Sequence, residues 1–182
     1  MHPSAMINGE KFFKKYCSEK ISEKKVLDVG SYDVNGTLRP IFFGAHYVGL
    51  DMMEGPGVDV IGSSHEIPFE QEYFDIVVST SCFEHDDMFW ISFLEMLRVL
   101  KTGGFMYINA PSNGFYHGHP GDNWRFYADS WKALEKWGLK NGTNVKLIES
   151  YISDSLTGFQ DCEENFDGLL SWKDSVGIFT KF

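Results

Sequence analysis

The sequence predicts an open, doubly wound α/β sheet, and three observations support this fold class. Short apolar runs rich in β-branched residues recur along the chain, bounded by glycine, proline or acidic turn residues. Their apolarity is continuous rather than alternating, which is typical of parallel strands that are buried on both faces. Helical patterns separate the runs, and parallel neighbours need such crossover connections, so we expect three layers, α/β/α.

The first half of the chain predicts an N-terminal helix within residues 1–24 and then four strands. Lysines interleaved with aromatic residues indicate an amphipathic helix with a solvated face, at Lys11, Phe12, Phe13, Lys14, Lys15 and Tyr16. The strands are expected at Lys25–Val29, His46–Asp51, Val58–Ile61 and Phe74–Thr80. The segment between the first two strands contains Leu38, Ile41 and Phe42, which predicts a short helix.

The second half predicts two helices and three strands. The first helix, Asp86–Lys101, has apolar residues at helical spacings, begins with two acids, and stops before a glycine pair. The second helix, Asp129–Trp137, has Asp129 or Ser130 as its N-cap and Gly138 as its stop. The strands are expected at Phe105–Asn109, Val145–Ile152 and Val176–Phe182.

Length and charge bound the function. The chain has 182 residues and a formal charge of −10, which suits one acidic domain spanning 1–182. No Lys or Arg lies between Arg39 and Arg98, whereas Asp51 to Glu95 contains eleven carboxylates, so we exclude a nucleic-acid partner. An export signal and a membrane span are also absent from the sequence pattern. The widely spaced cysteines Cys17, Cys82 and Cys162 predict a reducing, cytoplasmic location.

The loops that follow the first two strands are the predicted ligand site. Ligands of doubly wound sheets bind at the carboxyl ends of the strands, where the strand order reverses. Gly30 lets a ligand approach the backbone, and Asp51 can accept hydrogen bonds from both hydroxyls of a ribose. These two residues together predict an adenosine-type ligand.

Charge and glycine spacing select among adenosine-type ligands. A dinucleotide loop reads Gly-x-Gly-x-x-Gly, but Tyr32 occupies the second glycine position and no basic residue is near. A nucleotide-sugar oxidoreductase is therefore disfavoured. Asp28 and Asp33 flank the loop and suit a ligand with an ammonium or sulfonium group. The expected cofactor is S-adenosylmethionine.

Four motifs in order, VLDVGSYDVNG, YVGLDM, IPFEQEYFDIVVSTSCFEH and LRVLKTGGFMYINAPS, resemble the class I S-adenosylmethionine-dependent methyltransferases, especially their type-11 small-molecule branch. The resemblance covers roughly residues 25–137 and implies a Rossmann-like, mostly parallel sheet with an antiparallel last strand. It also implies that Asp28 positions the amino end of the cofactor and that Asp51 binds its ribose. The implied cofactor-binding residues are Asp28, Gly30, Ser31, Tyr32, Asp51, Met52, Ser63, Ser64 and Ser79. Ser63 stands where this branch often has an aspartate.

The acceptor of the methyl group is expected at loop 113–127, after the fifth strand. Methyl transfer depends mainly on aligning the acceptor, and a base is needed only if the acceptor loses a proton. The candidate catalytic residues are His85, His119 and Asp122, and the candidate substrate-binding residues are Glu84, His117, Trp124, Arg125 and Tyr127. Polar groups among aromatics suit a small hydroxylated acceptor, a sugar or related metabolite. His117, His119 and Asp122 lack an obvious fourth metal ligand, so no metal is expected.

Some alternatives stay open on the sequence alone. Tyr32 and Ser63 depart from the family pattern, so a cofactor-binding module without catalysis competes with the enzyme. Cys82 has no activating partner in the sequence and is interpreted as a small apolar filler. Met88, Trp90 and Trp131 fall outside the inward helical stripes and are candidate contacts of a homodimer.

Overall fold

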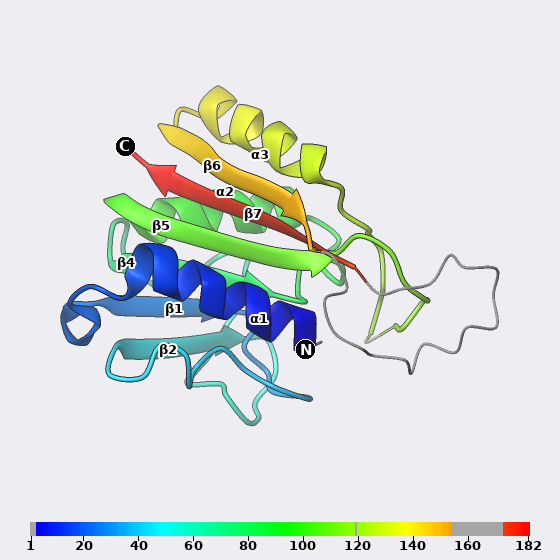
Figure 1. Ribbon diagram of the computed structural model, residues 1–182, viewed down its shortest axis with the longest axis horizontal. Coiled ribbons are helices and arrows are strands. Elements are labelled where there is room, and N and C mark those ends of the chain that lie inside the picture. Colours follow the sequence, from blue (N-terminus) through cyan, green and yellow to red (C-terminus); the bar gives the residue numbers. More distant parts are fainter. Residues whose placement is uncertain (1–2, 119, 154–172) are drawn as a thin grey trace.

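The computed structural model describes residues 3–118, 120–153 and 173–182 and contains a seven-stranded sheet (Figure 1). Its order is β3-β2-β1-β4-β5-β7-β6. The strands are β1 (Lys25–Val29), β2 (His46–Asp51), β3 (Val60–Ile61), β4 (Phe74–Thr80), β5 (Leu100–Pro111), β6 (Val145–Ile152) and β7 (Asp174–Lys181). The first five strands pair in parallel, whereas β7 pairs antiparallel with both β5 and β6. The Rossmann-like fold with an antiparallel last strand is thereby confirmed.

Strand order reverses between β1 and β4, which places the ligand crevice of this fold at their carboxyl ends. Both strands are short and buried along almost their whole length, as expected of strands covered on both faces. The side chains that follow β1, β2, β4 and β5 therefore meet at one edge of the sheet. This edge carries most of the residues that the sequence nominates for cofactor and acceptor.

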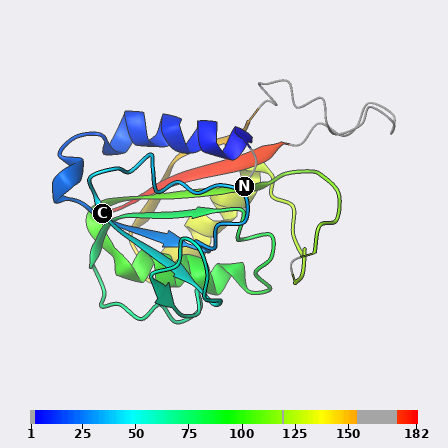
Figure 2. The same ribbon diagram turned by 90° about the horizontal axis from the view of Figure 1, so that it is seen from below.

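Helices cover both faces of the sheet (Figure 2). On one face lies α1 (Pro3–Phe12), continued by a π-helical turn (Phe13–Cys17) and a short 3₁₀ turn (Ile21–Glu23). On the other lie α2 (Phe89–Val99) and α3 (Ala128–Lys140). Each face has its own core, with Phe12, Phe42 and Tyr107 in one and Phe93, Leu97 and Trp131 in the other. No helix in the described part of the chain is long and apolar enough to cross a membrane.

Four predicted strands have the observed bounds, and the differences elsewhere have physical causes. The helix expected at Asp86–Lys101 ends at Val99, because Leu100 is extended and already pairs with Phe74 as the first residue of β5. The ladder then shifts between Phe74 and Ile76, where the chain accommodates the glycine turn. The third strand is shorter than expected, and only Val60 and Ile61 pair with β2.

The prediction of a short helix between β1 and β2 is wrong. Residues 39–45 form successive turns instead, in which Ile41 N–H donates to Leu38, Phe43 N–H to Pro40 and Ala45 N–H to Phe42. The apolar residues are still buried, since Leu38 and Phe42 are at most 1% exposed. The periodicity thus identified the buried side chains correctly but not the backbone that carries them.

The second helix begins one residue early and runs past its expected stop. Tyr127 caps it, with its N–H 3.2 Å from Ser130 Oγ, so neither Asp129 nor Ser130 is the N-cap. Gly138 lies inside the helix, where a Cβ would lie 2.7 Å from Val145 Cγ1. The glycine therefore permits close packing of α3 on β6 rather than ending the helix.

The prediction that Trp131 is a dimer contact is wrong. Its indole is fully buried, stacks on Phe126 at 5.2 Å between ring centroids, and donates to Ser175 Oγ at 2.7 Å. Trp90 also packs partly against the core, whereas Met88 is 39% exposed. The α3 tryptophan thus joins the acceptor loop to the antiparallel end of the sheet.

Candidate active site

The loop after β1 is fixed to the end of β2. The N–H groups of Gly30 and Ser31 both donate to the carbonyl oxygen of Leu50, at 2.9 and 3.1 Å. Gly30 has φ of +80°, and a Cβ there would lie 2.5 Å from Cys82 Sγ, so only glycine fits. Burial also raises the pKa of the Cys82 thiol, which is a packing group and not a thiolate at neutral pH.

Asp51, the predicted ribose ligand, ends β2 beside this loop. Its Oδ2 accepts from Tyr32 N–H and its Oδ1 from Met53 N–H, both at 3.1 Å. These bonds orient the carboxylate and leave a further lone pair on each oxygen. Both oxygens can therefore accept hydroxyl protons from a diol. Met52, the neighbouring candidate, is 68% exposed.

Tyr32, which replaces the usual second glycine, is accommodated by another glycine. A Cβ at Gly55 would lie 2.1 Å from Tyr32 Cε2, so the ring packs directly on the backbone of the loop after β2. The Tyr32 side chain keeps 36% of its surface exposed. The departure from the family pattern is thus compensated within the site by Gly55.

Asp28 is a buried acid within β1. Tyr47 Oη donates to Asp28 Oδ2 at 2.6 Å, and the residue is 4% exposed. Burial raises the pKa of Asp28 to about 6, although the Tyr47 hydrogen bond and Arg39 act in the opposite direction. The ionised carboxylate is therefore held at a cost in stability.

Replacing Asp28 with asparagine should stabilise the protein at alkaline pH. The folded-state pKa lies above the ordinary value, so the contribution of Asp28 to stability is present below about pH 4 and is lost as the pH rises through about 6. Asparagine keeps an oxygen for Tyr47 and does not ionise. Urea unfolding at pH 8 should show Asp28→Asn to be more stable than the wild type by on the order of 2 kcal/mol, with no difference near pH 4.

Asp75 provides the control of opposite sign. Hydrogen bonds from Lys25 N–H and Lys101 Nζ outweigh its burial and hold the pKa of Asp75 below its usual range. Asp75→Asn should therefore lose stability at pH 8. If Asp28→Asn is instead destabilising at pH 8, burial does not disfavour the Asp28 carboxylate.

The segment predicted to border the adenine is tied to the start of α2. Ser63 Oγ accepts from His65 N–H at 3.1 Å, and His65 Nε2 lies 2.7 Å from Asp86 Oδ1. Ser64 Oγ accepts from Ser92 Oγ at 2.8 Å. Ser79 Oγ is buried and donates to the Val29 carbonyl at 2.9 Å, which bridges β4 to β1. The Ser79 hydroxyl thus already has a partner within the sheet.

Glu84, one turn after β4, is an unusual buried acid. It is 0% exposed, and neither carboxylate oxygen has a hydrogen-bond partner among the described residues. Burial raises the pKa of Glu84 to about 8, and the negative charges of Asp174 and Asp122 act in the same direction. Thr80 Oγ1 and Asn109 Nδ2, at the ends of β4 and β5, are also buried without a described partner. Buried polar groups are normally hydrogen-bonded, so these atoms are candidates for contacts with a ligand.

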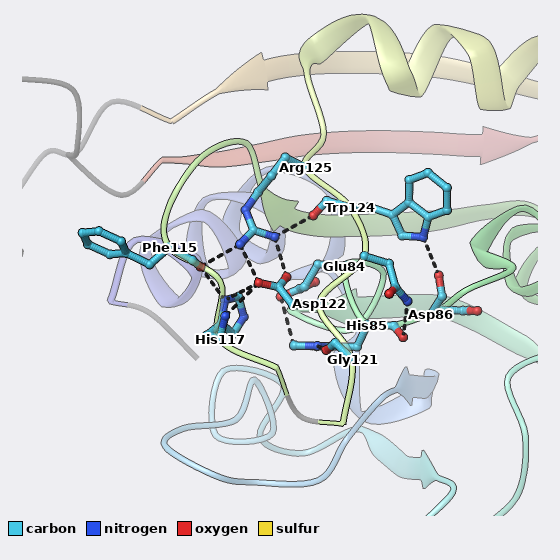
Figure 3. A network of polar contacts seen from close by, with 10 residues as sticks. Glu84, His85, Asp86, Phe115, His117, Gly121, Asp122, Trp124 and Arg125 are labelled. Atoms are coloured by element: carbon cyan, nitrogen blue, oxygen red, sulfur yellow. Dashed lines mark hydrogen bonds and ion pairs between the residues drawn. The ribbon is translucent and has the colours of Figure 1, made fainter.

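Two histidines converge on Glu84 (Figure 3). His85 donates from Nδ1 to the Gly121 carbonyl, and its Nε2 lies 3.7 Å from Glu84 Oε1. The His117 ring crosses the His85 ring edge-on, with 5.0 Å between centroids. The acceptor loop thus brings His117 to the residues that follow β4.

Asp122 anchors the loop after β5. It is 1% exposed and accepts from Arg125 Nη2 at 2.7 Å and from His117 N–H at 2.9 Å (Figure 3). The Arg125 hydrogen bonds lower the pKa of Asp122 to about 2. A carboxylate this acidic is a poor proton acceptor at neutral pH, so the geometry gives Asp122 a positioning role. Arg125 Nη2 also donates to the Phe115 carbonyl at 2.8 Å and closes the loop.

Both aromatic candidates, Trp124 and Tyr127, are exposed, but Trp124 is anchored by two contacts. Trp124 Nε1 donates to the Asp86 carbonyl at 2.9 Å, and its ring meets Phe89 edge-on at 5.4 Å. Tyr127 is 69% exposed. His119 lies outside the described residues. The sequence reading did not single out Thr80 and Asn109, although a polar residue at the end of an apolar strand was an available signal.

Comparisons with known proteins identify relatives of part of the chain. A family model described as a methyltransferase domain matches residues 27–108. The phthiotriol/phenolphthiotriol dimycocerosates methyltransferase 1 of Mycobacterium ulcerans is 32% identical over 108 residues. That alignment covers 48% of this chain and only 37% of the curated relative, so the chain spans little more than a third of its length.

Solved structures share the fold at low identity. The MccD protein has a TM-score of 0.65 at 14% identity, with 99% of both chains covered. A Listeria monocytogenes protein assigned to the S-adenosylmethionine-dependent methyltransferases has a TM-score of 0.61 at 15% identity, covering 98% of this chain and 99% of that one. The [4+2]-cyclase SpnF has a TM-score of 0.62 at 14% identity, covering 86% and 73%. Since one fold carries different reactions, activity must be argued from the site.

Proposed function

We propose that this chain, whose residues 27–108 belong to the methyltransferase domain family, transfers a methyl group from S-adenosylmethionine to a hydroxyl of a small molecule. The observation that carries the proposal is the pair of loops at the strand reversal, where the Gly30 turn packs against Cys82 and Asp51 presents both carboxylate oxygens. The stretch between Arg39 and Arg98 has no basic residue to hold a phosphate. A sulfonium cofactor needs none.

The cofactor residues are proposed in two groups. Asp28, Gly30, Ser31 and Tyr32 surround the methionine part, and an ammonium group can donate to the backbone carbonyl oxygens of this loop, whose Gly30 and Ser31 N–H groups are already bonded to Leu50. Asp51 and Met52 hold the ribose, and Ser63 and Ser64 border the adenine. Ser79 supports the site from behind, because its hydroxyl joins β4 to β1.

The acceptor is proposed to lie between the end of β4 and loop 113–127. Thr80, Glu84 and Asn109 offer buried polar atoms without described partners, which a polyhydroxylated molecule would satisfy. Trp124, Arg125 and Tyr127 border the same loop. A sugar or a related metabolite fits this polarity. The alignment with the Mycobacterium ulcerans relative covers less than half of this chain, so it does not indicate the acceptor of this protein.

His85 is the proposed residue that activates the acceptor hydroxyl. Its Nδ1 is a hydrogen-bond donor to Gly121, so Nε2 holds the lone pair, on the side facing Glu84. His119 stays a candidate of the same kind, and Asp122 positions the loop. Methyl transfer is an in-line displacement in which alignment supplies much of the rate, and removal of the hydroxyl proton supplies the rest.

His85→Gln should lower kcat by roughly 100-fold or more while leaving the affinity for S-adenosylmethionine within about twofold. The assay measures the S-adenosylhomocysteine formed when sugars, polyols and phenols are offered as acceptors. The acceptor that it identifies is then used to compare the variants. His46→Gln, an exposed histidine at the opposite end of β2, is the matched control and should keep full activity. Wild-type rates in His85→Gln would remove His85 from the mechanism.

A cofactor-binding module without catalysis is the second candidate, which Tyr32 and Ser63 favour because both depart from the family pattern. It predicts cofactor binding with no methylation of any member of the panel. The packing of Tyr32 on Gly55 weighs against it, because the departure leaves the loop ordered.

A further inference from the structure

We propose that Glu84, His85 and His117 form a binding site for a divalent transition-metal cation on the acceptor side of the active site. One ligand atom from each residue lies within 4.8 Å of the other two (Figure 3). A cation with ligand bonds of about 2.1 Å holds tetrahedral donors roughly 3.4 Å apart. Glu84 Oε1 and His85 Nε2 are already 3.7 Å apart, so small side-chain movements would close the three ligands around an ion.

The Glu84 carboxyl is the observation that points to a cation. It is completely buried, and neither oxygen has a hydrogen-bond partner among the described residues. Buried carboxylates are normally paired, hydrogen-bonded or bound to a metal. Among the described residues its ion-pair partner is His85 Nε2, and imidazole nitrogen is itself a common metal ligand. A cation between the two would satisfy both.

The two imidazoles are oriented as metal ligands are. His85 Nδ1 contacts the Gly121 carbonyl, an acceptor only, so this nitrogen carries the proton. His117 Nδ1 lies 3.1 Å from the Phe115 carbonyl and 3.2 Å from Asp122 Oδ2, which are also acceptors only. Each ring therefore presents Nε2 as its electron-pair donor. Metal-binding histidines almost always bond their other nitrogen in this way, to a carbonyl or a carboxylate.

The surrounding charge also suits a divalent cation. Asp122 and Asp174 act electrostatically on Glu84, whereas the Arg125 guanidinium that opposes them is paired with Asp122. Two imidazoles and one carboxylate favour zinc, cobalt or a similar ion over magnesium, which prefers oxygen ligands.

The three proposed ligands differ from the group that the sequence suggested, and the difference lies in the role of Asp122. The sequence grouped Asp122 with His117 and His119 as ligands and found no fourth. In the structure Asp122 orients His117 from behind, while Glu84 and His85 arrive from the segment after β4. A three-ligand site with an open position is the arrangement of catalytic rather than structural zinc.

The open position gives the cation a role in the reaction, and this role rests on the proposed function. The histidine side chains are 21% and 37% exposed, so the site opens toward solvent on their side. With the cation bound, His85 Nε2 is a ligand and not a base, and a hydroxyl oxygen on the cation releases its proton to water more readily. The oxygen then attacks the methyl carbon as the carbon–sulfur bond breaks, and the bonding pair passes to sulfur. The products are the methyl ether, S-adenosylhomocysteine and one proton.

Cation binding can be measured without any acceptor. Protein treated with EDTA and dialysed should bind one equivalent of Zn²⁺ by calorimetry, and one of Co²⁺ with visible absorption bands of a low-symmetry site. Glu84→Gln and His117→Ala should each weaken binding at least about 10-fold. His46→Ala, which removes an exposed histidine far from the cluster, should bind as the wild type does. Because His117 is partly exposed, its variant tests the site even if Glu84→Gln unfolds.

The outcomes separate this proposal from the preceding one. Lack of saturable Zn²⁺ and Co²⁺ binding, or equal affinity in wild type and His117→Ala, would overturn the metal site. Titration of the same preparations with S-adenosylmethionine tests the methyltransferase proposal by itself. Cation binding without cofactor binding would refute the methyltransferase and keep the site.

Discussion

Asp51→Ala is expected to weaken the binding of S-adenosylmethionine by roughly 30- to 150-fold, which corresponds to about 2–3 kcal/mol for charge-assisted hydrogen bonds to two hydroxyls. The same change removes the acceptor for Tyr32 N–H and Met53 N–H, so the loops on both sides lose their anchor. Isothermal titration of cofactor and of S-adenosylhomocysteine measures the effect. Loss of the Tyr32 and Met53 hydrogen bonds should weaken cofactor binding further, because the site of the free protein is then less ordered.

Two further variants separate ribose binding from charge and from loop order. Asp51→Asn keeps one acceptor oxygen and should give an intermediate loss. Glu70→Ala removes an exposed acid from the same base-free stretch and should leave the affinity unchanged. Equal affinity of Asp51→Ala and wild type would exclude Asp51 as the ribose ligand.

Arg125→Met should destabilise the folded protein by about 3 kcal/mol or more, because it leaves Asp122 as a buried carboxylate without its guanidinium. Asp122 is 1% exposed, so water cannot replace the lost partner. For a protein of this size the midpoint of thermal unfolding should fall by roughly 6–12 °C. Differential scanning calorimetry measures it.

The double variant tests the cause of that loss. Asp122→Asn removes the charge but keeps an oxygen for His117 N–H. Combined with Arg125→Met, it should recover most of the stability, since no buried charge is then unpaired. If the double variant is as unstable as the sum of the single variants, packing of Arg125 rather than its charge is responsible.

The fold could be predicted where the information is local. Apolar runs such as KVLDV and FDIVVST end at the observed residues, because burial on both faces leaves a continuous signal. The secondary structure of Leu100 and Gly138 was predicted wrongly because tertiary packing determines it. Leu100 pairs with Phe74 as part of a strand, and Gly138 lies within a helix that packs closely on Val145. The turn at residues 39–45 kept helical spacing of its apolar residues without forming a helix.

The candidate site was predictable residue by residue but not as an arrangement. Position after a strand was enough to nominate Asp51, Glu84 and His85. The Glu84 carboxylate has no hydrogen-bond partner among the described residues, whereas that of Asp122 has several, and this difference depends on how the loop after β5 folds back toward Glu84. The contact between His85 and His117 depends on the same loop, which no local pattern specifies.

The central claim is that the crevice at the strand reversal binds S-adenosylmethionine, and one titration tests it most directly. Calorimetry of the wild-type protein with S-adenosylmethionine, S-adenosylhomocysteine and NAD⁺ should show saturable one-to-one binding of the first two and none of the dinucleotide. Absence of heat with both sulfur compounds at millimolar concentration, or preferential binding of NAD⁺, would contradict the account.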